Sequence, residues 1–195
     1  GHLERFNPAF LYCKDRITRP QFIEAIRIAS FLERGSDVDV VLDLMTHDLD
    51  LVLALAPAPL KELHAVGKSL MTDSTDLANA RLIFEDGCVA NITASRISHK
   101  TERKLRVFQQ DSYLSMDFSR PSARIYQRET TGDGAPIFKE EKQTLEKGDS
   151  LMVEIADFIG AIRDGRPPAV TGRDGLRAIQ VADRVMRDIA ANRLP

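Results

Sequence analysis

Apolar and polar positions recur at helical spacing in two early segments of the chain. Residues 38–55 are predicted to form a helix, which ends before Pro57 because proline lacks the N–H that a further turn needs. Residues 7–17 are predicted to form a shorter helix. Asn7 is a favourable N-cap residue there, and Pro8 suits the first helical position.

Two more helices are predicted at the end of the chain, over residues 149–163 and 173–192. Gly165 follows the first of them and suits a left-handed C-cap. Each segment has an apolar stripe that we expect to face the core. The stripe consists of Phe158, Ile159 and Ile162 in the first helix, and of Leu176, Ile179, Val185, Met186 and Ile189 in the second.

Between these helices the pattern changes to short runs typical of strands. The clearest pair, residues 78–84 and 88–95, flanks Asp86-Gly87, a strong signal for a hairpin turn. Residues 1–6 alternate loosely and are also predicted to form a strand. The remaining predicted strands are residues 21–32, 61–71, 105–109, 113–118, 124–128 and 137–145. This order predicts an α+β domain with one open, mostly antiparallel sheet of about six strands and helices covering one face.

Composition excludes several classes of protein. The chain has 195 residues, which suits one domain, and 43% of them are hydrophobic, which is enough for a packed core. Its net charge of −2 argues against binding to nucleic acid or to an anionic membrane. No apolar run is long enough to span a membrane. The two cysteines, Cys13 and Cys88, predict packing roles in a cytoplasmic protein, because they are too few for a disulfide framework.

The helix over residues 38–55 carries the side chains best suited to chemistry. Asp43 and His47 are four residues apart, so they lie one turn apart on the same face, and Asp50 falls beside them. The segment has no Lys, Arg or Glu, the long residues usual on a solvated helix face, so its short polar side chains favour a sheltered cleft. We therefore predict His47 as a general acid/base and Asp43 as the carboxylate that orients its imidazole.

Other interpretations of this helix stay open. Polar helix faces are usually solvated surfaces, and the same imidazole and carboxylates could bind a metal ion from one face. No cysteine or second histidine cluster joins them, so we predict no metal. Asp48 lies near the apolar side of the helix and needs a buried partner, for which Arg27 and Arg81 are the candidates.

The remaining polar candidates carry weaker signals. His64 and His99 are predicted to be surface residues. Arg5 has a planar guanidinium that suits a phosphate or carboxylate group of a ligand, and an ion pair with Glu4 or another neighbour is the alternative. The sequence contains no G-x-G-x-x-G loop, no P-loop and no G-x-S-x-G turn.

Four segments, taken together, resemble the Gfo/Idh/MocA oxidoreductases. The opening stretch GHLERFNPA resembles the junction that follows their nucleotide-binding domain, and Asp43-x-x-x-His47-Asp48-x-Asp50 resembles their catalytic helix. Residues 83–90 with 94–96 resemble their sheet hairpin, and residues 158–176 resemble their closing helices. The likeness covers nearly the whole chain, and the four motifs occur in the order that the family has.

The resemblance implies that residues 1–195 are a C-terminal substrate-binding and oligomerisation domain. Members of the family pair this domain with an N-terminal Rossmann domain, which binds NAD or NADP and supplies a catalytic lysine. We expect that Rossmann domain to be absent from this chain. The cofactor-binding residues and the lysine therefore stay unassigned, and the isolated domain is expected to be inactive.

The resemblance also implies roles for particular residues. His47 resembles the residue that takes the hydroxyl proton as hydride leaves the sugar carbon, and Asp43 resembles its orienting partner, which contacts the substrate. Arg5 and Asn7 stand where the family's chain leaves the Rossmann domain, near the cleft between cofactor and substrate. We predict these two residues and Asp50 as substrate contacts.

The substrate class follows from the same resemblance. The Glu-Arg-Phe-Asn-Pro form is most similar to members that act on nucleotide-linked amino sugars, although inositol and simple sugar dehydrogenases share the Asp-x-x-x-His pattern. The expected function is NAD(P)-dependent oxidation of a sugar or nucleotide-sugar hydroxyl. The alternative is a non-catalytic sugar-binding or assembly module. In either case we predict a homo-oligomer through the open sheet face, which we expect to be apolar.

Overall fold

One eight-stranded sheet organises the chain. The structure, a computed structural model, describes residues 1–31, 37–132 and 134–192. The strand order is β2-β3-β4-β1-β5-β6-β7-β8; β1 is parallel to β4, and the other neighbouring pairs are antiparallel. The strands are β1 Phe22–Ile28, β2 Leu60–Lys68, β3 Leu77–Phe84, β4 Val89–Ser95, β5 Glu102–Phe108, β6 Ser112–Asp117, β7 Ser122–Thr130 and β8 Pro136–Thr144.

The predicted fold class is confirmed, although the predicted count of about six strands is too low. Each of the eight observed strands nevertheless overlaps a segment that the sequence predicts as a strand. In the β7–β8 ribbon, all of β8 and the end of β7 are exposed. Backbone pairing between β7 and β8 holds this ribbon in register, and both strands are predicted from the sequence, over residues 124–128 and 137–145. The strand predicted over residues 21–32 ends at Ile28, and residue 32 lies outside the described residues.

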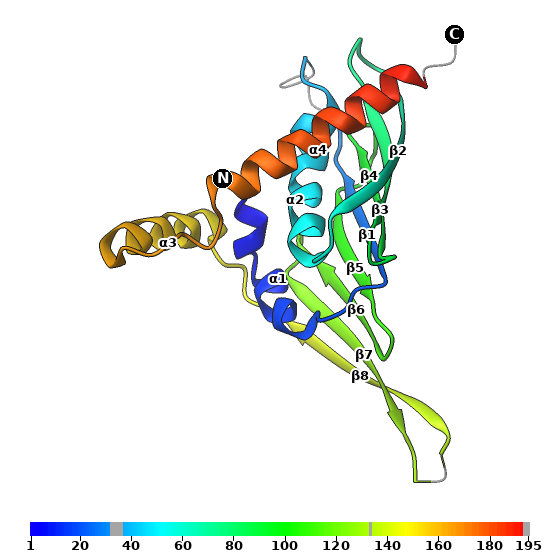
Figure 1. Cartoon of the computed structure of the whole chain (residues 1–195), viewed down its shortest axis with the longest axis vertical. Helices are drawn as coiled ribbons and strands as arrows, with labels where there is room; N and C mark the ends of the chain where they lie inside the picture. Colours follow the sequence, from blue (N-terminus) through cyan, green and yellow to red (C-terminus); the bar gives the residue numbers. More distant parts are fainter. Residues whose placement is uncertain (32–36, 133, 193–195) are drawn as a thin grey trace.

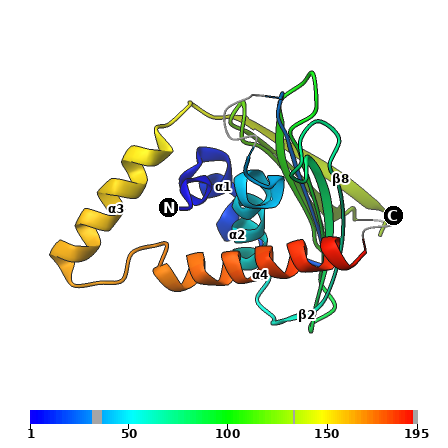
Figure 2. The same ribbon diagram turned by 90° about the horizontal axis from the view of Figure 1, so that it is seen from above.

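Helices α1 Pro8–Cys13, α2 Thr46–Leu55 and α4 Gly172–Ala191 cover one face of the sheet (Figures 1 and 2). Leu49 and Val52 of α2 and Val185 of α4 are fully buried against the inward residues of the strands. Asn7 caps α1 as predicted, because its side chain accepts a hydrogen bond from the Ala9 N–H. Burial of this apolar surface is the main force that holds the layers together.

Two local predictions at the N-terminal side are wrong. Residues 1–6 do not form a strand: Leu3–Phe6 is a 3₁₀ helix whose turns bury Glu4 and Phe6. The helix predicted over residues 38–55 is not uniform, because Val41–Met45 forms a π-helical turn before α2 begins. A second 3₁₀ helix, Lys14–Arg16, follows α1.

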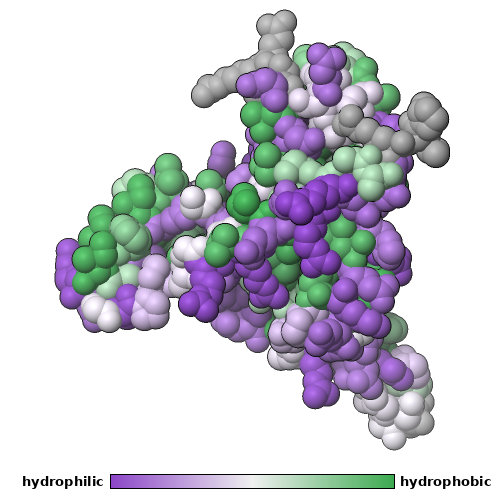
Figure 3. Space-filling view, turned by 45° about the horizontal axis from the view of Figure 1, so that its top comes forward, coloured by the Kyte–Doolittle hydropathy of each residue, from purple (hydrophilic) through white to green (hydrophobic). Residues whose placement is uncertain are grey.

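Helix α3, Ser150–Asp164, stands away from the sheet (Figures 1 and 2). The prediction that Phe158, Ile159 and Ile162 face the core is therefore wrong, since their exposed fractions are 56%, 50% and 68%. Figure 3 shows the hydrophobic side chains on this projecting helix. In α4 the stripe is divided: its later residues Val185 and Ile189 are buried, whereas its first two are exposed. Those first two are Leu176 and Ile179, which are 57% and 49% exposed, although Ala178 between them is buried.

Glycine stands at two turns where the backbone needs a positive φ. Gly87 ends the predicted Asp-Gly turn between β3 and β4 with a φ of 86°, and Gly165 caps α3 with a φ of 64°. Residues that carry a side chain rarely adopt a positive φ, which explains why glycine is a reliable sequence signal for both turns.

The uncovered face of the sheet is less apolar than predicted. An aromatic row crosses it, with Phe22 edge-on to Phe108 and with Phe108, Tyr113 and Tyr126 stacked in series. Charged residues surround this row, including the ion pair between Glu24 and Arg106. The strand alternation puts these polar residues outward because the inward positions form the core.

Paired isoleucine substitutions test this division between packed and projecting helices. Ile189→Ala should lower the free energy of unfolding by about 2–5 kcal/mol, because it empties a packed position that is 3% exposed. Ile162→Ala should change it by less than about 0.5 kcal/mol, because that side chain is 68% exposed. Urea denaturation of the 195-residue chain measures both values, and equal losses would contradict the placement of α3.

Candidate active site

A buried ion network joins the N-terminal segment, the sheet and α2. Arg27, inward on β1, donates from Nε and Nη2 to the two carboxylate oxygens of Asp48, each at 2.9 Å. Its Nη1 donates to Oε1 of Glu4 at 2.8 Å. The three residues are 2%, 1% and 4% exposed. Of the two candidate partners for Asp48, Arg27 is therefore the one that binds it.

The burial of these charges is compensated by their pairing. Burial alone would lower the pKa of Arg27, but the charges and hydrogen bonds of Asp48 and Glu4 outweigh it and raise that pKa, so the guanidinium stays charged. Every buried side-chain nitrogen and oxygen in the described part of the chain has a hydrogen-bond partner. Such a network fixes its members in one geometry.

A second ion pair lies beside the first. Arg5 donates to both oxygens of Asp50, from Nε at 2.8 Å and from Nη2 at 2.6 Å. His2 Nδ1 is 3.7 Å from Asp50 Oδ2, and Arg5 Nη2 is 3.7 Å from Asp174 Oδ1 at the start of α4. The structure thus brings the predicted residues Arg5 and Asp50 together, but as partners of each other.

Both the oxygen and the nitrogen of the Asn7 side-chain amide form hydrogen bonds within the protein. Besides capping α1, it donates from Nδ2 to Oε2 of Glu4 at 3.3 Å and to the Phe118 carbonyl at 3.4 Å. It is 8% exposed. These bonds attach the beginning of the chain to the end of β6.

His47 sits half-buried at the start of α2, beside the ion network. Burial is the largest effect on its imidazole and lowers its pKa below the ordinary value of 6.5. The charge of Arg27 acts in the same direction, whereas Asp48 and Glu4 raise the pKa by smaller amounts, and His2 lowers it slightly. A neutral imidazole at neutral pH is the form that can accept a proton.

Asp43 does not form the predicted pair with His47. It is exposed and lies within the π-helical turn Val41–Met45. Among the described residues no hydrogen bond or ion pair joins it to the imidazole. The physical reason is the wider turn: residues four apart there no longer lie directly above one another, as they do in an α-helix. Its role in catalysis stays a prediction.

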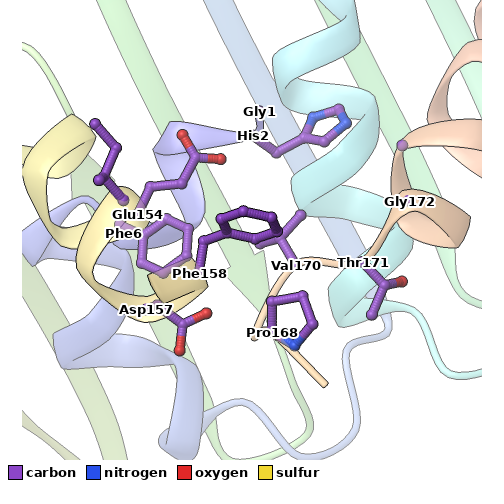
Figure 4. A pocket seen from close by; sticks show the side chains of 12 residues that line it. Gly1, His2, Phe6, Glu154, Asp157, Phe158, Pro168, Val170, Thr171 and Gly172 are labelled. Atoms are coloured by element: carbon purple, nitrogen blue, oxygen red, sulfur yellow. The ribbon is translucent and has the colours of Figure 1, made fainter. Parts of the chain in front are cut away.

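A cavity of about 420 Å³ opens between the N-terminal segment, α3 and the start of α4 (Figure 4). Phe6 and Phe158 supply much of its apolar wall, and His2, Glu154 and Thr171 supply polar groups. His47 is not among its lining residues. The residue that the cavity shares with the candidate site is His2. His2 lies close to Asp50 and is one of the residues that lower the pKa of His47.

The remaining candidates behave as packing or surface residues. Cys13 and Cys88 are buried and free, and burial raises the pKa of each thiol to about 11. The side chain of His64 is 69% exposed. Over residues 1–31, 37–132 and 134–192, no cluster of three or more His, Cys, Asp or Glu residues is placed to hold a metal ion.

Sequence reasoning missed two members of this constellation. Glu4 was considered only as a surface partner for Arg5, whereas it is buried on Arg27. Asp174 has no predicted site role, although it forms a capping box with Thr171 and faces Arg5. A signal for the first existed: the inward face of β1 reads Ile23, Ala25, Arg27, and a buried arginine needs carboxylates.

The comparisons with known proteins agree with this architecture. Residues 19–115 match the GFO/IDH/MocA C-terminal domain. The chain belongs to this family.

The chain is 40% identical over 187 residues to a UDP-N-acetylglucosamine 3-dehydrogenase from Acidithiobacillus ferrooxidans, covering 95% of this chain and 60% of that protein. A solved structure of UDP-N-acetylglucosamine 3-dehydrogenase GnnA from that organism superposes with a TM-score of 0.91 at 39% identity, over 98% of this chain and 62% of that one. A levoglucosan dehydrogenase in complex with NADH and L-sorbose shares the fold, with a TM-score of 0.81 at 15% identity, over 97% of this chain and 63% of that one.

The chain therefore spans about 60% of the length of the relatives that it matches. Those relatives are dehydrogenases by name. None of the helices in the described residues is long and apolar enough to cross a membrane.

The lowered pKa of His47 predicts a pH dependence of stability. The native state disfavours the protonated imidazole, so the stability that depends on neutral His47 is complete above its unfolded pKa near 6.5. It is lost as the pH falls from there through the folded pKa. Between pH 7.5 and 5.5, His47→Gln should therefore lose less free energy of unfolding than the unchanged chain. Urea denaturation at both pH values measures this, with the exposed His64→Gln as control, and an undiminished loss in His47→Gln would contradict it.

Proposed function

We propose that this chain is the substrate-side domain of an NAD(P)-dependent dehydrogenase that oxidises a hydroxyl of a sugar or nucleotide sugar. The observation that carries the proposal is the place of His47 in a domain of this family. The imidazole is half-buried on α2, next to the N-terminal segment, in surroundings that favour its neutral form. A neutral, sheltered imidazole suits a general base.

The proposed reaction gives His47 one task. A ring nitrogen of the imidazole accepts the proton of the substrate hydroxyl, while the C–H bond at the same carbon breaks and a C=O double bond forms. The hydride leaves with its electron pair to an oxidised pyridine dinucleotide, which supplies the redox chemistry. In the reverse direction the imidazolium returns the proton. Asp43 is proposed to contact the substrate, because it is exposed and lies in the π-helical turn just before the part of α2 that carries His47.

The cofactor is proposed to bind chiefly outside this chain. The 195 residues contain no glycine-rich phosphate loop, so no residue here is assigned to the dinucleotide. We propose that an N-terminal Rossmann domain supplies that site and the catalytic lysine, and that the isolated chain has no turnover. The exposed apolar side of α3 supports this division, because such a surface usually packs against other protein.

Arg5, Asn7 and Asp50 are proposed to act at the edge of the substrate site. Their mutual bonds, and those of Asn7 to Glu4 and to the backbone, hold the N-terminal segment against α2 and the sheet. Arg5 and Asp50 neutralise each other, so a charged group of the substrate would meet little net charge from this pair.

The substrate class is proposed to be a nucleotide-linked amino sugar. The support is the 40% identity to a protein named UDP-N-acetylglucosamine 3-dehydrogenase. We also propose a cytoplasmic location, because Cys13 and Cys88 are free thiols in a protein that needs no disulfide.

Replacement of His47 tests the proposed reaction in the longer protein with its dinucleotide domain. His47→Gln should lower kcat by about 10²–10⁴-fold, because that is the usual contribution of a general base. KM should change little, because glutamine keeps a polar side chain at this position. Steady-state assays with UDP-N-acetylglucosamine and NAD or NADP measure both quantities.

The control for that assay is His64→Gln, an exposed imidazole on β2 that should leave kcat unchanged. An unchanged kcat in His47→Gln would contradict the assigned role. Calorimetric binding of the sugar nucleotide without any turnover would instead support the non-catalytic alternative.

We further propose that the chain forms a homo-oligomer through the uncovered sheet face. The aromatic row of Phe22, Phe108, Tyr113 and Tyr126 crosses this face, and Phe108 is 38% exposed. A second copy would remove the row from water while the surrounding charges pair across the interface.

Sedimentation equilibrium of the 195-residue chain at micromolar concentration should show a dimer or a larger species. Phe108→Glu should convert it to a monomer, because the new charge would be buried without a partner. Ile162→Glu, on the projecting helix α3, is the matched control and should leave the mass unchanged. A monomer in the unchanged chain would contradict the proposal.

A further inference from the structure

One buried arginine links three separate parts of the chain at the point where His47 stands. Arg27 lies on β1, Asp48 follows His47 on α2, and Glu4 belongs to the N-terminal 3₁₀ helix. Three hydrogen bonds of 2.8–2.9 Å join them, and all three residues are buried. Because Asp48 is the next residue after His47, its two bonds to Arg27 fix the helical turn that carries the imidazole.

We propose that Arg27 is a positioning residue for His47: it ties the turn that carries the imidazole to β1 and to the N-terminal segment, and it holds a buried cation beside the imidazole. If the three charges served folding alone, their attraction for one another would be sufficient. The proposal adds that they also set the proton affinity of the His47 imidazole, although none of the three is bonded to it. Its catalytic meaning rests on the proposed function of His47, whereas its structural part does not.

The charges that act on His47 come from three elements. Arg27 on β1 lowers the pKa of His47, Asp48 on α2 and Glu4 in the N-terminal segment raise it, and His2 in that segment lowers it. From β5, Arg103 approaches Glu4 Oε1 to 4.0 Å. Arg27 therefore acts against the two carboxylates, and substitutions of Arg27 and of Glu4 should move the proton affinity of His47 in opposite directions.

The first experiment needs no turnover. NMR titration of the His47 ring protons in the 195-residue chain gives the midpoint of its protonation. Arg27→Gln should move this midpoint upward, because a nearby cation is lost. Glu4→Gln should move it downward, because a nearby anion is lost. Arg27→Lys keeps the charge but not the two-pronged bond, so its midpoint should stay closer to that of the unchanged chain than the Arg27→Gln midpoint does.

A matched control exists elsewhere in the fold. Arg96 is 4% exposed and donates from Nε to Asp76 at 2.8 Å, and it is bonded to the Val38 carbonyl ahead of the π-helical turn. Arg96→Gln therefore breaks a similarly buried pair that is not among the charges acting on His47. It should lower the Tm, as Arg27→Gln does, with a smaller shift of the His47 midpoint than in Arg27→Gln.

The outcomes separate the inference from the proposed function. Shifts of opposite sign in Arg27→Gln and Glu4→Gln support the inference, and shifts no larger than in Arg96→Gln overturn it. If Arg27→Gln does not fold, the downward shift in Glu4→Gln decides alone. In the longer protein, the acid limb of kcat/KM against pH should follow the titration shifts. Titration shifts in a protein without dehydrogenase activity would leave the inference standing and remove the proposed function.

Discussion

The bidentate bond between Arg27 and Asp48, extended to Glu4, is the constraint on which the arrangement of the site depends. Each of these charges would be costly to bury alone, because leaving water costs an ion several kcal/mol. Together they are tolerated only if the sheet, α2 and the N-terminal segment meet in one geometry. Hydrophobic burial turns the apolar side of a helix toward the sheet but, because it is not directional, does not by itself fix the rotation of that helix. The ion network supplies that specification at the end of α2 that carries His47.

The neighbouring pair of Arg5 and Asp50 extends the same logic along α2. Asp48 and Asp50 are two residues apart, so they point in different directions around the helix: one reaches β1, the other the N-terminal segment. The segment before α1 is thus bonded through Glu4, Arg5 and Asn7 to three different partners. These bonds hold the segment and its short 3₁₀ helix in place, and the segment forms one wall of the cavity.

Much of this could be predicted from the sequence where a pattern has only one physical solution. A carboxylate on the apolar side of a helix and an arginine on the inward side of a strand each require a buried partner of opposite charge, and Arg27 was among the two candidates for Asp48. The hairpin at Gly87 and the cap at Gly165 were predictable because glycine alone tolerates their backbone conformation without strain. The helices and most strands were predictable from their periods.

Other features were not predictable because the sequence is compatible with more than one structure. The stripe of Phe158, Ile159 and Ile162 shows that α3 is amphipathic, but it does not say which surface the stripe meets. The π-helical turn has the same residues that an α-helical turn would have, so the separation of Asp43 from His47 leaves no trace in spacing. The burial of Glu4 was not predictable because residues 1–6 are too few for their polar and apolar pattern to distinguish a 3₁₀ turn from a short strand.

The surroundings of His47 show which physical effect determines its protonation. The charges around the ring act in both directions: Arg27 and His2 disfavour the imidazolium, whereas Asp48 and Glu4 favour it. Burial is nevertheless the largest effect, and it favours the neutral ring. The protonation of the ring therefore depends first on its burial, and the charges of the neighbouring network shift it in both directions. Carboxylates beside a general base raise its pKa. Arg27 offsets this effect of Asp48 and Glu4 on His47, because it is a cation placed next to them.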